Sequence, residues 1–155
     1  MKLIYLNIDG VMNVIEDDLS FFPTHTAKIR ALCPSSTHIK YLNEIIAETD
    51  AQVVITSTWR RSISALYLNM LFSLCGFTGI ILDITPVLHG QRDIEIASHR
   101  ECYNRLHPKD RIENYVVIDD VKINITYIDN FIKINPEKGL QSQDAKKAIQ
   151  LLNEV

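Results

Sequence analysis

The stretch KLIYLNIDGVMN, from Lys2 to Asn13, decides which fold the rest of the chain is expected to adopt. It is apolar up to Ile8, and it then breaks at Asp9-Gly10, a pair that favours a loop. Asn7 and Asp9 are two positions apart, so in an extended chain their side chains point the same way. Polar residues at the end of a buried strand are typical of a functional edge, because ligands bind beyond the carboxyl ends of strands in open parallel sheets.

Short β-type runs alternate with helical patterns along the whole chain. The β-type runs, rich in β-branched and other apolar residues, cover residues 2–8, 51–56, 79–84, 114–120 and 131–135. Helical patterns cover residues 36–50, with Ser35 or Ser36 as the N-cap, and then 62–74, 93–106 and 142–155. Strands separated by such helices pair in parallel through right-handed crossovers. The pattern predicts a three-layer α/β/α sandwich around a five-stranded, mainly parallel sheet.

The length of the chain favours a single domain spanning residues 1–155. A chain of 155 residues is long enough for one well-buried core and too short for two comfortable domains. The irregular part, residues 14–34, is expected to be either a surface loop or hairpin or a flap over a site.

Charge and cysteine content narrow the expected partners and compartment. A net charge of −3 argues against a strongly basic nucleic-acid binder, although it leaves a local basic groove open. In the helix at 93–106, Arg100 and Arg105 are interleaved with Glu95 and Glu101, which predicts a solvated face rather than a nucleic-acid surface. Three cysteines, an odd count, predict reduced thiols in a cytosolic setting. No apolar run approaches the length of a membrane span, so we expect a cytoplasmic protein with no membrane partner.

Polar side chains follow four of the predicted strands or open the helices after them. They are Asn7 and Asp9, Thr56, Ser57 and Arg60, Arg92, and Asp119 and Asp120. Carboxylate, amide and hydroxyl oxygens suit a hard cation such as Mg²⁺, which favours carboxylates together with water and substrate phosphate. This edge of the sheet is therefore the expected site.

At these positions the sequence resembles the haloacid dehalogenase (HAD) superfamily of phosphatases. LNIDGV, VVITS, QRDIEI and YVVIDD are similar to the four motifs of that superfamily, in the expected order. DGVMN, VVITSTWRR and GLQSQDAKKAI resemble a small group without a cap domain, some members of which occur in multidomain RNA-repair proteins. The resemblance covers nearly the whole chain, and it implies a HAD-like Rossmannoid without a cap domain and with an open site.

The resemblance implies a role for each residue of the first two motifs. Asn7 stands at the position of the nucleophile, which would take the phosphoryl group as an aspartyl phosphate. Asp9 would protonate the leaving oxygen and then activate water. Gly10, Thr56 and Ser57 would lie against the substrate phosphate, and which of the two hydroxyls faces it stays open.

The same resemblance implies a cation and a metal site. Either Arg92 or Arg60 would neutralise charge on the transferring group. Mg²⁺ would be held by Asp119 and Asp120 together with the residues at positions 7 and 9. The substrate would be a phosphorylated small molecule or nucleotide, or a nucleic-acid end, and the oligomeric state is not indicated.

Asparagine at position 7 departs from the motif, which has aspartate there. A neutral amide is a poor nucleophile, and its presence removes one negative charge from the metal site. The chain is therefore expected to bind a phosphate better than it hydrolyses it. Three explanations stay open: a deliberate change that disables a Mg²⁺-dependent phosphomonoester hydrolase, a natural pseudo-phosphatase that acts as a phosphate- or partner-binding module, or a residue with no such role.

Overall fold

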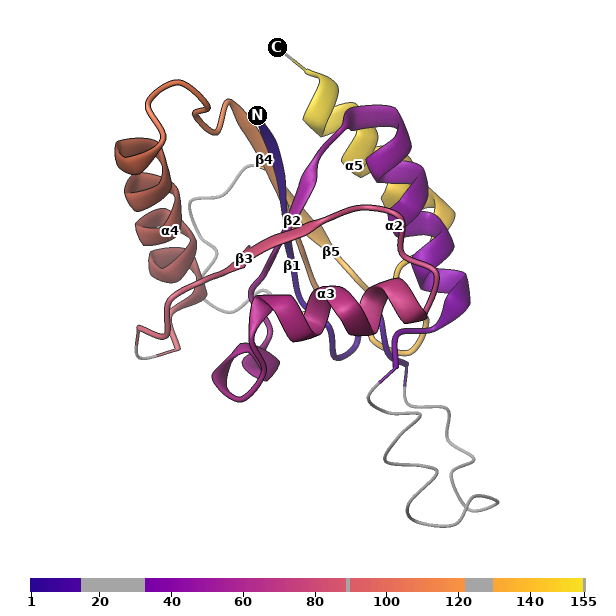
Figure 1. Cartoon of the computed structure of the whole chain (residues 1–155). Helices are drawn as coiled ribbons and strands as arrows, with labels where there is room; N and C mark the ends of the chain where they lie inside the picture. Colours follow the sequence, from indigo (N-terminus) through magenta and orange to yellow (C-terminus); the bar gives the residue numbers. More distant parts are fainter. Residues whose placement is uncertain (15–32, 89, 122–129, 155) are drawn as a thin grey trace.

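Five parallel strands form the sheet at the centre of the structure, a computed structural model that describes residues 1–14, 33–88, 90–121 and 130–154 (Figure 1). Along the sheet the order is β3-β2-β1-β4-β5, and each neighbouring pair is parallel. The strands are β1 Lys2–Leu6, β2 Gln52–Ile55, β3 Ile81–Ile84, β4 Asn114–Asp119 and β5 Phe131–Lys133. The predicted five-stranded parallel fold is confirmed.

Helices cover both faces of this sheet, which makes the predicted three layers. They are α2 Ser36–Thr49, the 3₁₀-helix η2 Thr58–Arg61, α3 Ala65–Leu74, α4 Arg92–Leu106 and α5 Ser142–Asn153. The side chains of β1 alternate between the faces, so Ile4 and Leu6 pack with α2, α3 and α5, whereas Leu3 and Tyr5 pack with Ile96 of α4. In Figure 1, α4 accordingly lies on one side of the strands, and α2 and α5 lie together on the other.

The helix predicted for residues 62–74 begins later and is preceded by a separate turn. η2 takes the chain away from β2, and α3 then starts after Ser64, whose hydroxyl oxygen accepts a hydrogen bond from the main-chain nitrogen of Tyr67 at 3.3 Å. Of the two candidate N-caps of α2, Ser35 holds the position, but its side chain makes no capping hydrogen bond.

The connection order reverses at β1. From β1 the chain proceeds through β2 to β3 on one side and returns to β4 and β5 on the other, so the carboxyl end of β1 is the switch point of the sheet. Main-chain hydrogen bonds extend the pairing past the strand ends: Asn7 N donates to Ile118 O at 3.0 Å, and Thr56 N donates to Leu6 O at 2.9 Å. The first polar residues after β1, β2 and β4 are therefore neighbours.

In the described part of the chain, η2 and α3 alone connect β2 to β3, and no cap domain is inserted there. The predicted flap, residues 14–34, falls almost wholly on residues 15–32, which lie outside the described ranges. Among the described residues, no helix is both long enough and apolar enough to span a bilayer.

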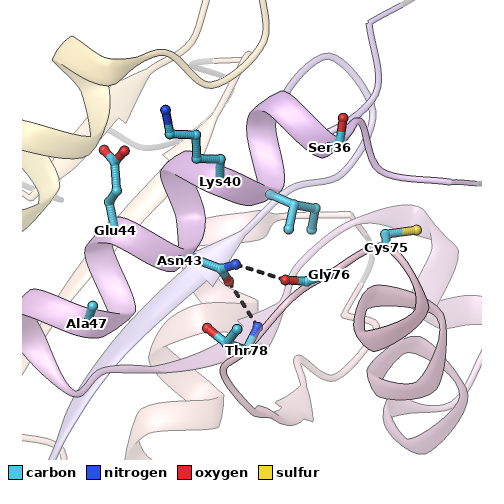
Figure 2. Close-up of a pocket in the computed structure, with 9 residues that line it drawn as sticks. Ser36, Lys40, Asn43, Glu44, Ala47, Cys75, Gly76 and Thr78 are labelled. Carbon is cyan, nitrogen blue, oxygen red and sulfur yellow. Dashed lines mark hydrogen bonds between the residues drawn. The ribbon is translucent and has the colours of Figure 1, made fainter.

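A groove of about 520 Å³ lies between α2 and the turn that follows α3 (Figure 2). Asn43 of α2 ties this turn in place, because its Nδ2 donates to Gly76 O at 2.9 Å and its Oδ1 accepts from Thr78 N at 3.0 Å. None of the residues predicted to form the site lines this groove.

Candidate active site

The side chain of Asn7 lies at the centre of the polar residues that follow β1 and β4. It is 7% exposed, and its Nδ2 group donates to three oxygens. These are Asp9 O at 3.0 Å, Asp119 Oδ1 at 3.2 Å and Asp120 Oδ1 at 2.8 Å. Because β1 and β4 are adjacent and parallel, their carboxyl ends bring these residues together. The first and fourth motifs therefore meet through one amide.

Asp119 is fully buried at the end of β4 and is paired with Arg92, the first residue of α4. The guanidinium of Arg92 donates to Oδ2 of Asp119, and Oδ1 accepts from Val121 N at 3.0 Å. Burial raises the pKa of Asp119 from its ordinary value, and the charge of Arg92 opposes that shift. Arg92 thus places a cation at the carboxylate edge.

Gly10 makes room for Asp120. Its φ is +75°, a conformation that side chains with a Cβ rarely adopt. A Cβ at this position would lie 2.7 Å from Asp120 Oδ2 and 3.1 Å from the Cβ of Pro136. The glycine therefore lets the carboxylate of Asp120 approach the loop after β1 and reach Asn7.

The two hydroxyls after β2 differ in their surroundings, although both are buried. Ser57 Oγ accepts from Trp59 N at 3.4 Å and so caps η2. Thr56 Oγ1 has no hydrogen-bond partner among the described residues. A buried hydroxyl without a partner is uncommon in folded proteins. The main chain of Thr56 is linked to the end of β1, because its nitrogen donates to the oxygen of Leu6, the residue before Asn7, at 2.9 Å.

Arg60 lies beneath this edge rather than on it, with a side chain that is 2% exposed. Its Nη2 contacts Glu95 Oε2 at 2.5 Å. Its other donors reach main-chain oxygens: Nε donates to Thr85 O at 3.1 Å, and Nη1 donates to Thr56 O and to Ser57 O. Burial lowers the pKa of Arg60, and Glu95 opposes the shift. Arg60 therefore braces the chain after β2 from inside.

Glu95 departs from the solvated face expected on α4, whereas Glu101 and Arg105 of that helix are exposed. Glu95 is 1% exposed, and besides Arg60 it binds Leu88 N through Oε1 at 2.9 Å. Glu95 can be buried because a carboxylate is stable inside a protein when a cation and a main-chain N–H satisfy it. Together, Arg60 and Glu95 join the loop after β2 to the loop before α4.

The sequence leaves open whether Trp59 contacts a substrate near the site or packs at the start of a helix. Its indole Nε1 donates to both carboxylate oxygens of Asp9, at 3.1 and 3.0 Å, from the 3₁₀-helix that follows β2. The signal in the sequence was weak, because a tryptophan near a strand end is as often a packing residue. In the structure it holds the carboxylate that the motif assigns to proton transfer.

The oxygens at this edge were tested for their fit to the predicted Mg²⁺. Neighbouring oxygen ligands of an octahedral Mg²⁺ lie about 3.0 Å apart. The Nδ2 atom of Asn7 lies 2.8–3.2 Å from its three oxygen partners, so by distance alone it stands where a ligand of the ion would stand. The atom that faces them is nevertheless a nitrogen bearing two hydrogens, which is no ligand for a cation. Among the described residues, no three His, Cys, Asp or Glu side chains are grouped to hold a metal ion. As arranged, the residues do not fit Mg²⁺.

Comparison with known proteins places these motifs in a family. No curated protein and no solved structure matches the chain significantly. The family described as the HAD domain in Swiss Army Knife RNA repair proteins matches residues 3–145, a range that includes all four motifs and, except for Lys2 of β1, every strand of the sheet. The chain therefore belongs to this family of HAD domains from RNA repair proteins.

Proposed function

We propose that this edge of the sheet is the phosphoryl site of a HAD-type phosphomonoester hydrolase whose nucleophile is replaced by Asn7. The chain as written would bind the phosphate and not hydrolyse it. The substrate we propose is a phosphorylated nucleic-acid end or nucleotide, because the family occurs in RNA repair proteins. The observation that carries the proposal is the convergence of Asn7, Asp119 and Asp120 through hydrogen bonds of 2.8–3.2 Å.

Two further side chains support a phosphate at this position. The buried hydroxyl of Thr56 has no partner in the part of the chain that the structure describes, and such a donor would find one in a phosphate oxygen. Arg92 is 20% exposed in its side chain, so its guanidinium can reach a ligand while it remains paired with Asp119. Arg60 cannot take this part, because its donors are committed inside the protein.

The Asn7→Asp change would supply the missing nucleophile. A carboxylate oxygen would attack phosphorus, and the bond from phosphorus to the leaving oxygen would break as Asp9 gives that oxygen its proton. Water would then attack the acyl phosphate and lose a proton to Asp9, which releases inorganic phosphate. Trp59 would keep the carboxylate of Asp9 in place through both steps. We propose that this variant, unlike the chain as written, requires Mg²⁺.

The test is phosphate release by the Asn7→Asp protein beside the chain as written, with and without Mg²⁺. Substrates are an aryl phosphate, mononucleotides and oligonucleotides phosphorylated at the 3′ or the 5′ end. We expect the Asn7→Asp protein to release phosphate. The Asn7→Asp/Asp9→Asn protein and the chain as written should release none. If the Asn7→Asp protein folds and stays silent across the panel, the hydrolase proposal is wrong.

A second candidate is a natural pseudo-phosphatase that binds a phosphate or a partner without cleavage. The favouring observation is that the Nδ2 group of Asn7 donates to three oxygens of the site, which aspartate at this position could not do. This candidate predicts that the chain as written binds phosphorylated oligonucleotides and that Asn7→Asp produces no turnover.

A further inference from the structure

The amide of Asn7 faces three oxygens that all carry negative charge or partial negative charge. Two are carboxylate oxygens of Asp119 and Asp120, and the third is the main-chain oxygen of Asp9. Oxygens of this kind repel one another unless a positive group lies between them. Arg92 binds Oδ2 of Asp119, the oxygen that does not face Asn7. The positive group among the three oxygens is the NH₂ of the amide.

The orientation of this amide follows from its partners. If the side chain were turned over, Oδ1 would meet three acceptors with no hydrogen between them. In the orientation with Nδ2 inward, the two amide hydrogens are shared among three oxygens at 2.8–3.2 Å, so that every acceptor faces a donor group. A divalent cation at this point would require the amide to turn over and to give up these bonds.

We propose that the amide hydrogens of Asn7 replace the divalent cation in this chain, so that its phosphoryl site assembles without metal and Mg²⁺ competes with the amide. The inference rests on the proposed function only in assigning the cation to this edge. It makes Asn7 more than an inert substitute for aspartate: the residue holds together the two carboxylates that a metal would otherwise hold.

Replacement of Asn7 by alanine distinguishes two roles of the amide, because they predict opposite changes in the affinity for Mg²⁺. If the amide were a cation ligand through Oδ1, Asn7→Ala would weaken Mg²⁺ binding. If the amide hydrogens replace the cation, Asn7→Ala leaves Asp119 and Asp120 without their donor, and Mg²⁺ binds more tightly. Asn43→Ala is the matched control, since it removes an amide with two local hydrogen bonds at the groove in Figure 2, away from the site.

The experiment is titration calorimetry with MgCl₂ alone, without phosphate, on the full chain and on the Asn7→Ala, Asn7→Asp and Asn43→Ala proteins. Thermal unfolding in EDTA and in excess Mg²⁺ is the second measurement. For both Asn7 variants we expect at least about tenfold tighter Mg²⁺ binding and a higher Tm in Mg²⁺ than in EDTA. The Tm of the chain as written should be the same in EDTA as in Mg²⁺, and so should the Tm of the Asn43→Ala protein.

The inference is overturned if the chain as written binds Mg²⁺ as tightly as the Asn7→Asp protein. It is equally overturned if the Asn7→Ala protein has the circular dichroism spectrum of a folded chain and binds Mg²⁺ no better than the chain as written. Because these measurements contain no substrate, a silent Asn7→Asp protein in the phosphate-release assay contradicts the proposed hydrolase and leaves the Mg²⁺ result standing.

Discussion

Replacement of Arg60 by methionine tests whether this guanidinium supports the site from inside or binds the phosphate. Methionine keeps much of the length of the side chain and removes its charge and its donors. Glu95, 1% exposed, would lose its cation and keep Leu88 N as a donor. Breaking a buried ion pair by removing one partner costs about 3–5 kcal/mol.

Main-chain oxygens add to this cost. The main-chain oxygens of Thr56 and Thr85 lose a donor when Arg60 is replaced, whereas Ser57 O keeps the main-chain nitrogen of residue 60 as a donor at 3.1 Å. A buried acceptor left unpaired costs about 1–3 kcal/mol, less where water can reach it. We therefore expect Arg60→Met to lower the free energy of unfolding by at least about 4 kcal/mol, close to the whole stability of a marginal domain.

Urea unfolding at neutral pH, followed by far-ultraviolet circular dichroism, measures this change. The double variant Arg60→Met/Glu95→Leu should lose less than the sum of the two single changes, because no unpaired buried charge remains. Arg92→Met is the contrasting variant and should weaken phosphate binding. The reasoning is refuted if Arg60→Met costs under about 1 kcal/mol and instead weakens phosphate binding, since Arg60 would then be an accessible ligand.

Trp59→Phe keeps the ring packing and removes the donor to Asp9, so in the hydrolytic variant kcat should fall by about tenfold or more with little change in KM; an unchanged kcat would mean that the indole does not position the carboxylate. Gly139→Ala should lower the Tm and the free energy of unfolding, the latter by about 1–3 kcal/mol, because φ is +64° and a Cβ there would lie 2.5 Å from Nε2 of His38. A Tm equal to that of the parent would contradict this. The hydrogen bond from His99 lowers the pKa of Asp83 below 3.8 in the folded protein. Its ionised form therefore stabilises the fold above about pH 4, and this contribution disappears as pH falls through the folded-state pKa. The difference in urea stability between the parent and Asp83→Asn, under about 1 kcal/mol because the side chain is 51% exposed, should shrink as pH falls through the folded-state pKa of Asp83 and then vanish; a difference that grows toward low pH would contradict the assignment.

The strand pattern could be predicted from the sequence because it depends on local apolar runs. The same rule overextended the first strand: residues 7 and 8 look like strand residues, but β1 ends at Leu6. The chain turns after Ile8, whose main-chain oxygen accepts from the nitrogens of Met12 at 2.8 Å and Val11 at 3.1 Å. The residues of the first and fourth motifs lie together because β1 and β4 are adjacent parallel strands, whose carboxyl ends share one edge.

Pairwise contacts between distant segments were not predictable in this way. Glu95 looks like a surface residue because periodicity records polarity and not partners, and its burial depends on Arg60, which lies 35 positions away in the sequence. The bond from Trp59 to Asp9 likewise joins residues 50 positions apart. Neither contact follows from a helical or strand pattern, and both became visible only in the folded chain.

The indole of Trp59 also gives the protein an optical probe at its own site. The chain has one tryptophan, so fluorescence excited at wavelengths that its six tyrosines do not absorb has a single source. Because that indole N–H is bonded to both oxygens of Asp9, any ligand that draws the carboxylate away changes the surroundings of the fluorophore. Titration of phosphate can therefore be followed by emission in the unlabelled protein, even in a chain that turns nothing over, and titration of Mg²⁺ in the same way in the Asn7 variants.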